Sequence, residues 1–192
     1  MKKLLITGFD PFGGEAINPA WEAVKLLPET IGQYALCKLQ IPTVFGNGAA
    51  AVLEKAALEQ PDVILCIGQA GGRTAVTPER IAINVRDAKI SDNAGNQPNG
   101  EFVAAEGPAA YFSTLPVEDM AQAIRDAGLP GIVSNSAGAF VCNDTLYTLL
   151  HHYNGSAVRV GFIHVPYLPQ QGSPSLPLVD TARALETAIF AI

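Results

Sequence analysis

The order of apolar and polar positions along the chain predicts strands and helices that alternate. Short, nearly uninterrupted apolar runs predict buried strands over residues 4–9, 34–44, 63–67 and 158–165. Apolar positions at helical spacing predict helices from Pro19, with Asn18 as the N-cap, and over residues 49–59, 117–127 and 178–192. This alternation is typical of a parallel α/β sheet with right-handed crossovers. We expect one domain, residues 1–192, built as a three-layer α/β/α sandwich around a largely parallel, mixed twisted sheet.

Residues 69–109 interrupt this alternation. Residues 79–85 alternate as a half-exposed strand does, residues 92–100 are polar and rich in turn formers, and Phe102 and Val103 suggest a returning strand. Long irregular connections in a compact domain are more often functional than not. We therefore expect the excursion from Asp87 to Phe102 to supply an interface or a lid.

A second irregular stretch leads to Cys142, a candidate nucleophile. Residues 131–133 suggest a short buried strand, small residues follow as a tight turn, and residues 145–153 have the spacing of a helix. A cysteine at such a junction lies beside unpaired helix N–H groups, whose partial positive charge favours the thiolate. The alternative is that Cys142 is a small buried hydrophobe, as most free cysteines are.

Other reactive side chains fall at the same end of the predicted sheet. Ligands of open parallel sheets bind beyond the carboxyl ends of the strands, where residues 9–14, residues 68–79, Cys142 and His164 are expected. A nucleophilic cysteine needs a base and a group that orients the base. His151 and His152 lie well beyond Cys142 in the same helix, which favours His164. The alternatives are a structural histidine at a strand end and, for Glu79, a solvated carboxylate or a partner of Arg80.

Composition excludes several classes of function. The net charge of −6 comes without a basic cluster, which disfavours nucleic-acid binding. Residues 13–14 lack the spacing of a phosphate-binding loop, and no group of residues has metal-ligand spacing, so we expect neither cofactor nor metal. Three cysteines form neither a disulfide framework nor a metal motif, which suits the cytoplasm.

Hydropathy also bears on association. No apolar run is long enough to cross a bilayer, and the run after Met1 stops at Gly8, so we expect a first strand there and no membrane contact. Only 16% of residues are charged and 48% are hydrophobic, with a mean hydropathy of +0.22. This low charge makes an oligomer plausible.

Four blocks of sequence resemble one known family. They are GFDPFGG at 8–14 with the following Asn18-Pro19, GQAGGR at 68–73 continuing through residue 84, SAGAFVCN at 136–143, and GFIHVP at 161–166. In this order, and over essentially the whole chain, the sequence resembles pyrrolidone-carboxylate peptidases, also called pyroglutamyl peptidases of type I.

The resemblance implies a cysteine exopeptidase that hydrolyses the bond after an N-terminal pyroglutamyl residue through a thioester. It implies Cys142 as nucleophile, His164 as base and acid, and Glu79 as the orienting carboxylate. It further implies that Phe9, Phe12 and Phe140 sandwich the pyrrolidone ring, that Gln69 bonds the lactam, and that the protein is a homotetramer. We expect the imidazolium and the helix start to bring the pKa of Cys142 below neutrality.

Two other functions fit the same residues. One is a thiol-dependent amidase of a different small amide. The other is a binding module that keeps the ring pocket without turnover. A hydrolysis assay on pyroglutamyl substrates separates both from the peptidase.

Overall fold

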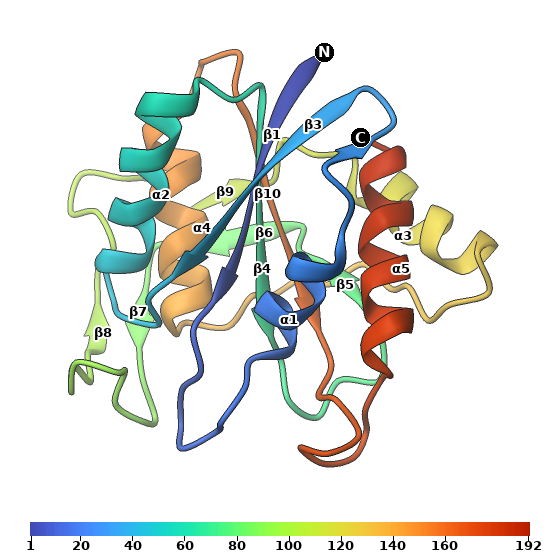
Figure 1. Cartoon of the computed structure of the whole chain (residues 1–192). Helices are drawn as coiled ribbons and strands as arrows, with labels where there is room; N and C mark the ends of the chain where they lie inside the picture. Colours follow the sequence, from blue (N-terminus) through green and yellow to red (C-terminus); the bar gives the residue numbers. More distant parts are fainter.

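The structure, a computed structural model of all 192 residues, is built on a six-stranded sheet (Figure 1). The strand order is β2-β3-β1-β4-β10-β5, and neighbouring strands among β3, β1, β4 and β10 are parallel. The short strands β2 and β5 at the two edges are antiparallel to their neighbours. The bounds are β1 Lys2–Phe9, β2 Thr30–Ile31, β3 Tyr34–Ile41, β4 Val63–Gln69, β5 Thr77–Pro78 and β10 Arg159–Val165. The predicted mixed, largely parallel sheet is confirmed.

Five helices cover the two faces of this sheet. Helices α1 (Pro19–Leu26), α3 (Val117–Asp126) and α5 (Leu178–Phe190) pack on one face, and α2 (Asn47–Glu59) and α4 (Val141–His152) on the other (Figure 1). Alternate strand residues divide between two cores, so that Leu4 and Ile6 belong to the first core and Leu5 to the second. The three-layer prediction is therefore confirmed. None of the helices is both long and apolar enough to span a membrane.

Local signals place the ends of several elements. The Asn18 side chain accepts a hydrogen bond from the Ala20 N–H at 3.0 Å, and Pro19 is the first residue of α1, as predicted.

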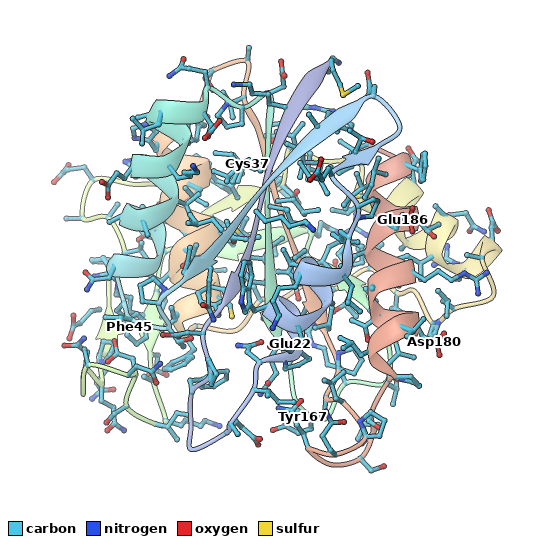
Figure 2. The ribbon with its side chains drawn as sticks, viewed as in Figure 1. Glu22, Cys37, Phe45, Tyr167, Asp180 and Glu186 are labelled. Carbon is cyan, nitrogen blue, oxygen red and sulfur yellow. The ribbon has the colours of Figure 1, made fainter.

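Figure 2 shows Phe45 and Tyr167 near the end of the molecule to which the parallel strands point, and Cys37 of β3 nearer the opposite end. The carboxyl ends of the strands therefore form a distinct face of the molecule.

The predicted buried strand at residues 131–133 is wrong. Ile132 is 55% exposed, and the segment makes only single bridges, from Gly131 to Val76 and from Ser134 to Glu79. Gly131 lies so close to Ile124 of α3 that a Cβ there would come within 2.7 Å of the Ile124 Cβ. The segment is bonded to the edge of the sheet at isolated bridges without continuous pairing, so it does not form a strand.

The excursion between β5 and α3 forms two small antiparallel ribbons. Strand β6 (Ile81–Ile83) pairs with β9 (Ala110–Phe112), and β7 (Arg86–Asp87) pairs with β8 (Asn99–Glu101). The returning strand predicted at Phe102 and Val103 is wrong, because pairing ends at Glu101 and the Phe102 side chain is 68% exposed.

Candidate active site

A cavity of about 310 Å³ opens at the carboxyl ends of the parallel strands. It collects residues from segments far apart in the sequence. Its lining includes six of the seven predicted site residues, namely Phe9, Phe12, Gln69, Phe140, Cys142 and His164, together with Asn18, Thr43, Ala70, Arg73, Ser136, Ala137 and Gly138. The seventh, Glu79, lies directly behind His164. The predicted convergence at this edge of the sheet is confirmed.

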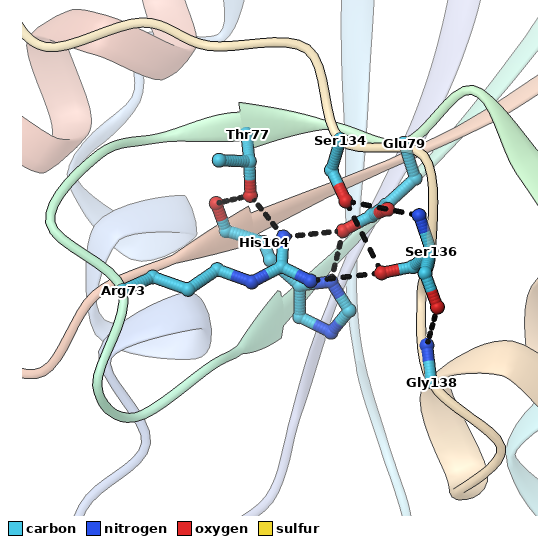
Figure 3. Close-up of polar contacts among 7 residues, drawn as sticks. All are labelled: Arg73, Thr77, Glu79, Ser134, Ser136, Gly138 and His164. Atoms are coloured by element: carbon cyan, nitrogen blue, oxygen red, sulfur yellow. Dashed lines mark hydrogen bonds and ion pairs between the residues drawn. The ribbon is translucent and has the colours of Figure 1, made fainter.

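His164 and Glu79 form a buried, hydrogen-bonded pair. His164 is the sixth residue of β10 and pairs with Thr77 of β5, so Glu79, two residues further on, lies beside the imidazole. The distance from His164 Nδ1 to Glu79 Oε1 is 2.7 Å, and the two side chains are 4% and 0% exposed (Figure 3). With Nδ1–H donated to the carboxylate, Nε2 is the ring nitrogen left to accept a proton. Glu79 is therefore not a solvated carboxylate.

Cys142 lies in the first turn of α4, which begins at Val141, four residues earlier than predicted. Its sulfur packs over Gly68 of β4, where an added Cβ would come within 2.9 Å of Sγ. Gly68 is the register partner of His164 in the neighbouring strand. The lack of a side chain at Gly68 thus lets the thiol approach the sheet beside the imidazole.

The start of α4 is fixed by the two residues that follow the cysteine. Asn143 donates to the carbonyl oxygens of Ile83 and Val85 at 2.9 and 3.0 Å and accepts from the Ile83 N–H. Buried Asp144 pairs with Arg86 Nε at 2.6 Å and accepts from the Gly46 N–H at 2.8 Å. The helix carrying Cys142 is thereby held in one position against β6, β7 and α2.

The protonation state of the thiol differs from the sequence-based expectation. Burial, followed by the negative charge of Glu79, raises the pKa of Cys142 to about 12, although Arg73 opposes this. Burial lowers the pKa of His164, although Glu79 opposes this. The expectation of a pKa below neutrality for Cys142 is therefore wrong for the free protein. A raised pKa of Cys142 and a lowered pKa of His164 favour the neutral thiol and the neutral imidazole, and the neutral imidazole is the form that can take the thiol proton.

The three predicted phenylalanines line the cavity, and a fourth packs against one of them. The ring centroids of Phe12 and Phe140 lie 6.0 Å apart, and buried Phe9 lines the floor and packs on Phe162 at 6.2 Å. Phe45, which the sequence did not single out, packs edge-on against Phe140 at 5.3 Å. The contacts with Phe12 and Phe45 fix the orientation of the Phe140 ring at the edge of the cavity.

Gln69, the last residue of β4, presents an amide to the cavity. Its Oε1 accepts from Gln171 Nε2 at 3.1 Å, and Gln171 Oε1 in turn accepts from the Leu168 N–H at 3.0 Å. The Gln69 Nε2 group therefore remains as a donor for a ligand. The link to Gln171, more than 100 residues away in sequence, had no signal in the sequence pattern.

Arg73 is the principal site residue that the sequence analysis did not assign. Its Nη1 lies 2.6 Å from Glu79 Oε1, and its Nη2 lies 3.0 Å from the Ser136 carbonyl oxygen (Figure 3). The only available signal was its place in the GQAGGR block. Arg80, the partner considered for Glu79, instead bonds Asn135 and Glu118.

The excluded histidines lie away from the cavity. His151 and His152 lie in the last turn of α4, and both are exposed. The His151 Nδ1 is 2.8 Å from the Tyr111 hydroxyl. His164 is thus the one histidine of the chain that lines the cavity.

The long excursion contributes no residue to the cavity lining but is bonded to segments that lie beside the cavity. Asp92 accepts from the backbone N–H groups of Phe45, Ala94 and Asn96 at 2.8–2.9 Å. Asn93 donates to Asp10 Oδ1 and the Pro11 carbonyl oxygen at 3.1 and 2.9 Å. The excursion is therefore fastened to the two segments that carry Phe12 and Phe45.

Comparison with known proteins places this architecture among close relatives. The family model described as pyroglutamyl peptidase matches residues 2–192. A pyrrolidone-carboxylate peptidase of Levilactobacillus brevis is 55% identical over 99% of this chain and 97% of its own. The crystal structure of Bacillus amyloliquefaciens pyroglutamyl peptidase I superposes with a TM-score of 0.95 at 46% identity, covering 100% of this chain and 96% of that one. A Thermococcus litoralis pyrrolidone carboxyl peptidase also gives 0.95, at 35% identity, covering 100% and 93%.

Proposed function

Since the chain belongs to the pyroglutamyl peptidase family, cysteine hydrolases that remove an N-terminal pyroglutamyl residue from peptides, we propose that Cys142, His164 and Glu79 carry out this reaction. The observation that carries the assignment is the buried His164–Glu79 pair at 2.7 Å, which faces the same cavity as Cys142. The three residues come from α4, β10 and the segment after β5, and neither Cys37 nor Cys66 lines this cavity.

In the first half of the reaction, the Cys142 sulfur attacks the carbonyl carbon that joins pyroglutamate to the next residue. His164 Nε2 takes the thiol proton as the carbon–sulfur bond forms, and Glu79 stabilises the resulting imidazolium. The imidazolium then gives this proton to the leaving amine as the carbon–nitrogen bond breaks. The products of this half are a pyroglutamyl thioester and the shortened peptide.

In the second half, water attacks the thioester while His164 accepts one of its protons. The carbon–sulfur bond breaks, the proton returns to sulfur, and free pyroglutamic acid leaves. No side chain caps the amino end of α4, so its first backbone N–H groups are available for the oxyanion of both intermediates. Such a donor contributes about 3 kcal/mol to transition-state stabilisation.

The shape and polarity of the cavity support selection of the cyclic N-terminus. A pyrrolidone ring is uncharged and flat, which suits a cavity walled by Phe9, Phe12 and Phe140, and its lactam carbonyl can accept from Gln69 Nε2. An uncyclised glutamine N-terminus would bring an ammonium group among these phenyl rings without an acidic partner. The desolvation cost of that charge opposes its binding.

Two finer properties complete the proposal. A resting thiol needs a reducing compartment, and the other two cysteines are also free, which supports the cytoplasm.

Self-association is supported by the exposed apolar side chains of Leu26 and Val179, which border a hollow of about 460 Å³ beside α1 and α5. Light scattering with size-exclusion chromatography measures the oligomeric state directly.

The test is hydrolysis of matched fluorogenic amides of pyroglutamate, glutamine and proline by the wild-type protein. We expect hydrolysis of the pyroglutamyl amide alone, its abolition by a thiol reagent, and unchanged rates for Cys37→Ala, which removes a thiol outside the cavity. Preferred hydrolysis of another amide would favour the general amidase. Binding of pyroglutamate without turnover would favour the non-catalytic binder.

A further inference from the structure

Arg73 makes contacts that tie together three separate parts of the site. It follows β4 in a loop in which Gly71 packs tightly on Tyr167; a Cβ at Gly71 would lie 2.2 Å from the ring. From there its guanidinium reaches Thr77 and Glu79 in the segment that carries the carboxylate. It also reaches the Ser136 carbonyl oxygen in the turn that leads to Cys142. The side chain is 27% exposed and borders the cavity.

Two donors meet at Oε1 of Glu79, and Arg73 supplies one of them. Oε1 accepts from both His164 Nδ1 and Arg73 Nη1, at 2.7 and 2.6 Å, whereas the buried Oε2 has no partner. A buried carboxylate that has lost one of two donors is poorly satisfied and free to rotate about its last bond. Arg73 therefore limits where Oε1 can lie relative to the imidazole.

The turn before Cys142 is bonded to the Glu79 segment through the backbone of its first residue, Ser134, and Arg73 adds a contact two residues further on. Ser134 Oγ donates to the Ser136 carbonyl oxygen at 3.1 Å, and Ser136 Oγ accepts from the Gly138 N–H at 3.2 Å (Figure 3). Arg73 Nη2 adds a second link between this turn and the Glu79 segment, at the Ser136 carbonyl oxygen. A guanidinium can make both contacts at once because its donors form a planar fork, which a lysine ammonium lacks.

We propose that Arg73 is a positioning residue of the proposed peptidase reaction: it holds Glu79 Oε1 against His164 and fixes the turn that delivers Cys142. Arg73 acts through Glu79 and has no bond to make or break itself. This inference rests on the proposed roles of Cys142, His164 and Glu79.

The charge of Arg73 also adjusts the proton affinity of the pair. The titratable groups around His164 and Glu79 are Arg73 from the loop after β4, Cys142 from α4 and, behind it, Cys66 of β4. The positive charge of Arg73 lowers the pKa of both Glu79 and His164. Without it, the coupled Glu79–His164 pair takes up its proton at a higher pH. Since the protonated pair cannot accept the thiol proton, the acid limb of activity then moves to higher pH.

The experiment compares Arg73→Met and Arg73→Lys with the matched control Arg80→Met. The Arg80 side chain contacts the same 134–136 segment through Asn135 but forms no hydrogen bond with the Glu79 or His164 side chain. The readout is the pH profile of kcat/KM on a pyroglutamyl amide, with thermal unfolding measured in parallel. We expect Arg73→Met to lose about 10²-fold at the optimum and to shift its acid limb upward. Arg73→Lys should keep the wild-type limb and lose less, and Arg80→Met should match the wild type in both.

A double-mutant cycle keeps the inference testable if Arg73→Met is unstable. In a Glu79→Gln background, replacing Arg73 by Lys should cost much less activity than in the wild type, because the shared carboxylate is gone. Equal losses in both backgrounds, or an Arg73→Met acid limb identical to that of the wild type, would overturn the role of Arg73. Failure of the wild-type protein to hydrolyse the pyroglutamyl amide would instead overturn the proposed function.

Discussion

Replacing Glu79 with glutamine removes one negative charge and leaves the size of the side chain almost unchanged. In the structure, Glu79 is fully buried and its Oε1 accepts hydrogen bonds from both His164 and Arg73. An amide at this position cannot stabilise an imidazolium, and its NH2 group can face the Nδ1–H of His164. We expect the fold to persist, with the imidazole free to adopt the wrong tautomer or orientation.

Two magnitudes follow from these contacts. Orientation and charge stabilisation of an acid–base histidine are worth about 10²–10⁴ in rate, so we expect a loss of about 10³-fold, or roughly 4 kcal/mol. Breaking a buried charge pair costs about 3–5 kcal/mol, and the lower end applies because Arg73 is partly exposed and can be solvated. For a chain of this size, about 3 kcal/mol corresponds to a fall in Tm of roughly 6–12 °C.

The pH dependence gives a further check. Glu79 raises the pKa of His164 against the effect of burial, so its removal lowers the pKa of the imidazole and should move the acid limb of kcat/KM to lower pH. Arg73→Met should move the same limb in the opposite direction. The matched control is Glu118→Gln, which removes an ion pair with Arg80 at a side chain that is 64% exposed. Activity of Glu79→Gln within about threefold of wild type, at any pH, would refute the reasoning.

Two further predictions concern the free thiol and the ring pocket. Burial lowers the pKa of His164 from 6.5, so the acid limb of the wild-type kcat/KM profile should have its midpoint below pH 6.5. Because the pKa of Cys142 is raised to about 12, the rate of its alkylation by iodoacetamide in the absence of substrate should keep rising with pH above 8. An alkylation rate that is already constant at pH 7 would show a preformed thiolate instead. Phe140→Ala should lower kcat/KM by roughly 30-fold, about 2 kcal/mol of lost ring contact, chiefly through KM. Phe112→Ala, at an exposed phenylalanine outside the cavity, should leave both constants unchanged, and an unchanged KM in Phe140→Ala would contradict the placement of the ring.

The strands and helices that build the sheet were predictable because their burial pattern is local. Leu4 to Phe9 and Val63 to Ile67 are nearly uninterrupted apolar runs, which are typical of central parallel strands with both faces covered. The Asn18-Pro19 pair marked the start of α1 for equally local reasons. The prediction at residues 131–133 failed because the burial of a short apolar run depends on its neighbours. Ile132 points to solvent, while only Gly131 fits against α3.

The residues of the candidate site also differ in how far the sequence alone could identify them. Cys142 and His164 could be selected because strand ends and a helix start can be recognised in the sequence, and both lie in the cavity. The roles of Arg73 and Gln171 could not be selected, because their contacts join segments up to about a hundred residues apart. The pKa of Cys142 was mispredicted because the helix start is visible in the sequence, whereas the burial of the thiol depends on how α4 packs over Gly68.

The nucleophile is the point on which the proposed reaction depends, and Cys142→Ala tests it most directly. The measurement is kcat/KM of this variant on a pyroglutamyl amide, with unfolding monitored to establish that the fold is intact. Since alanine cannot form the thioester, we expect a loss of about 10⁶-fold with an unchanged unfolding transition. A folded Cys142→Ala protein that retains more than about a hundredth of the wild-type activity would contradict a covalent mechanism at this sulfur.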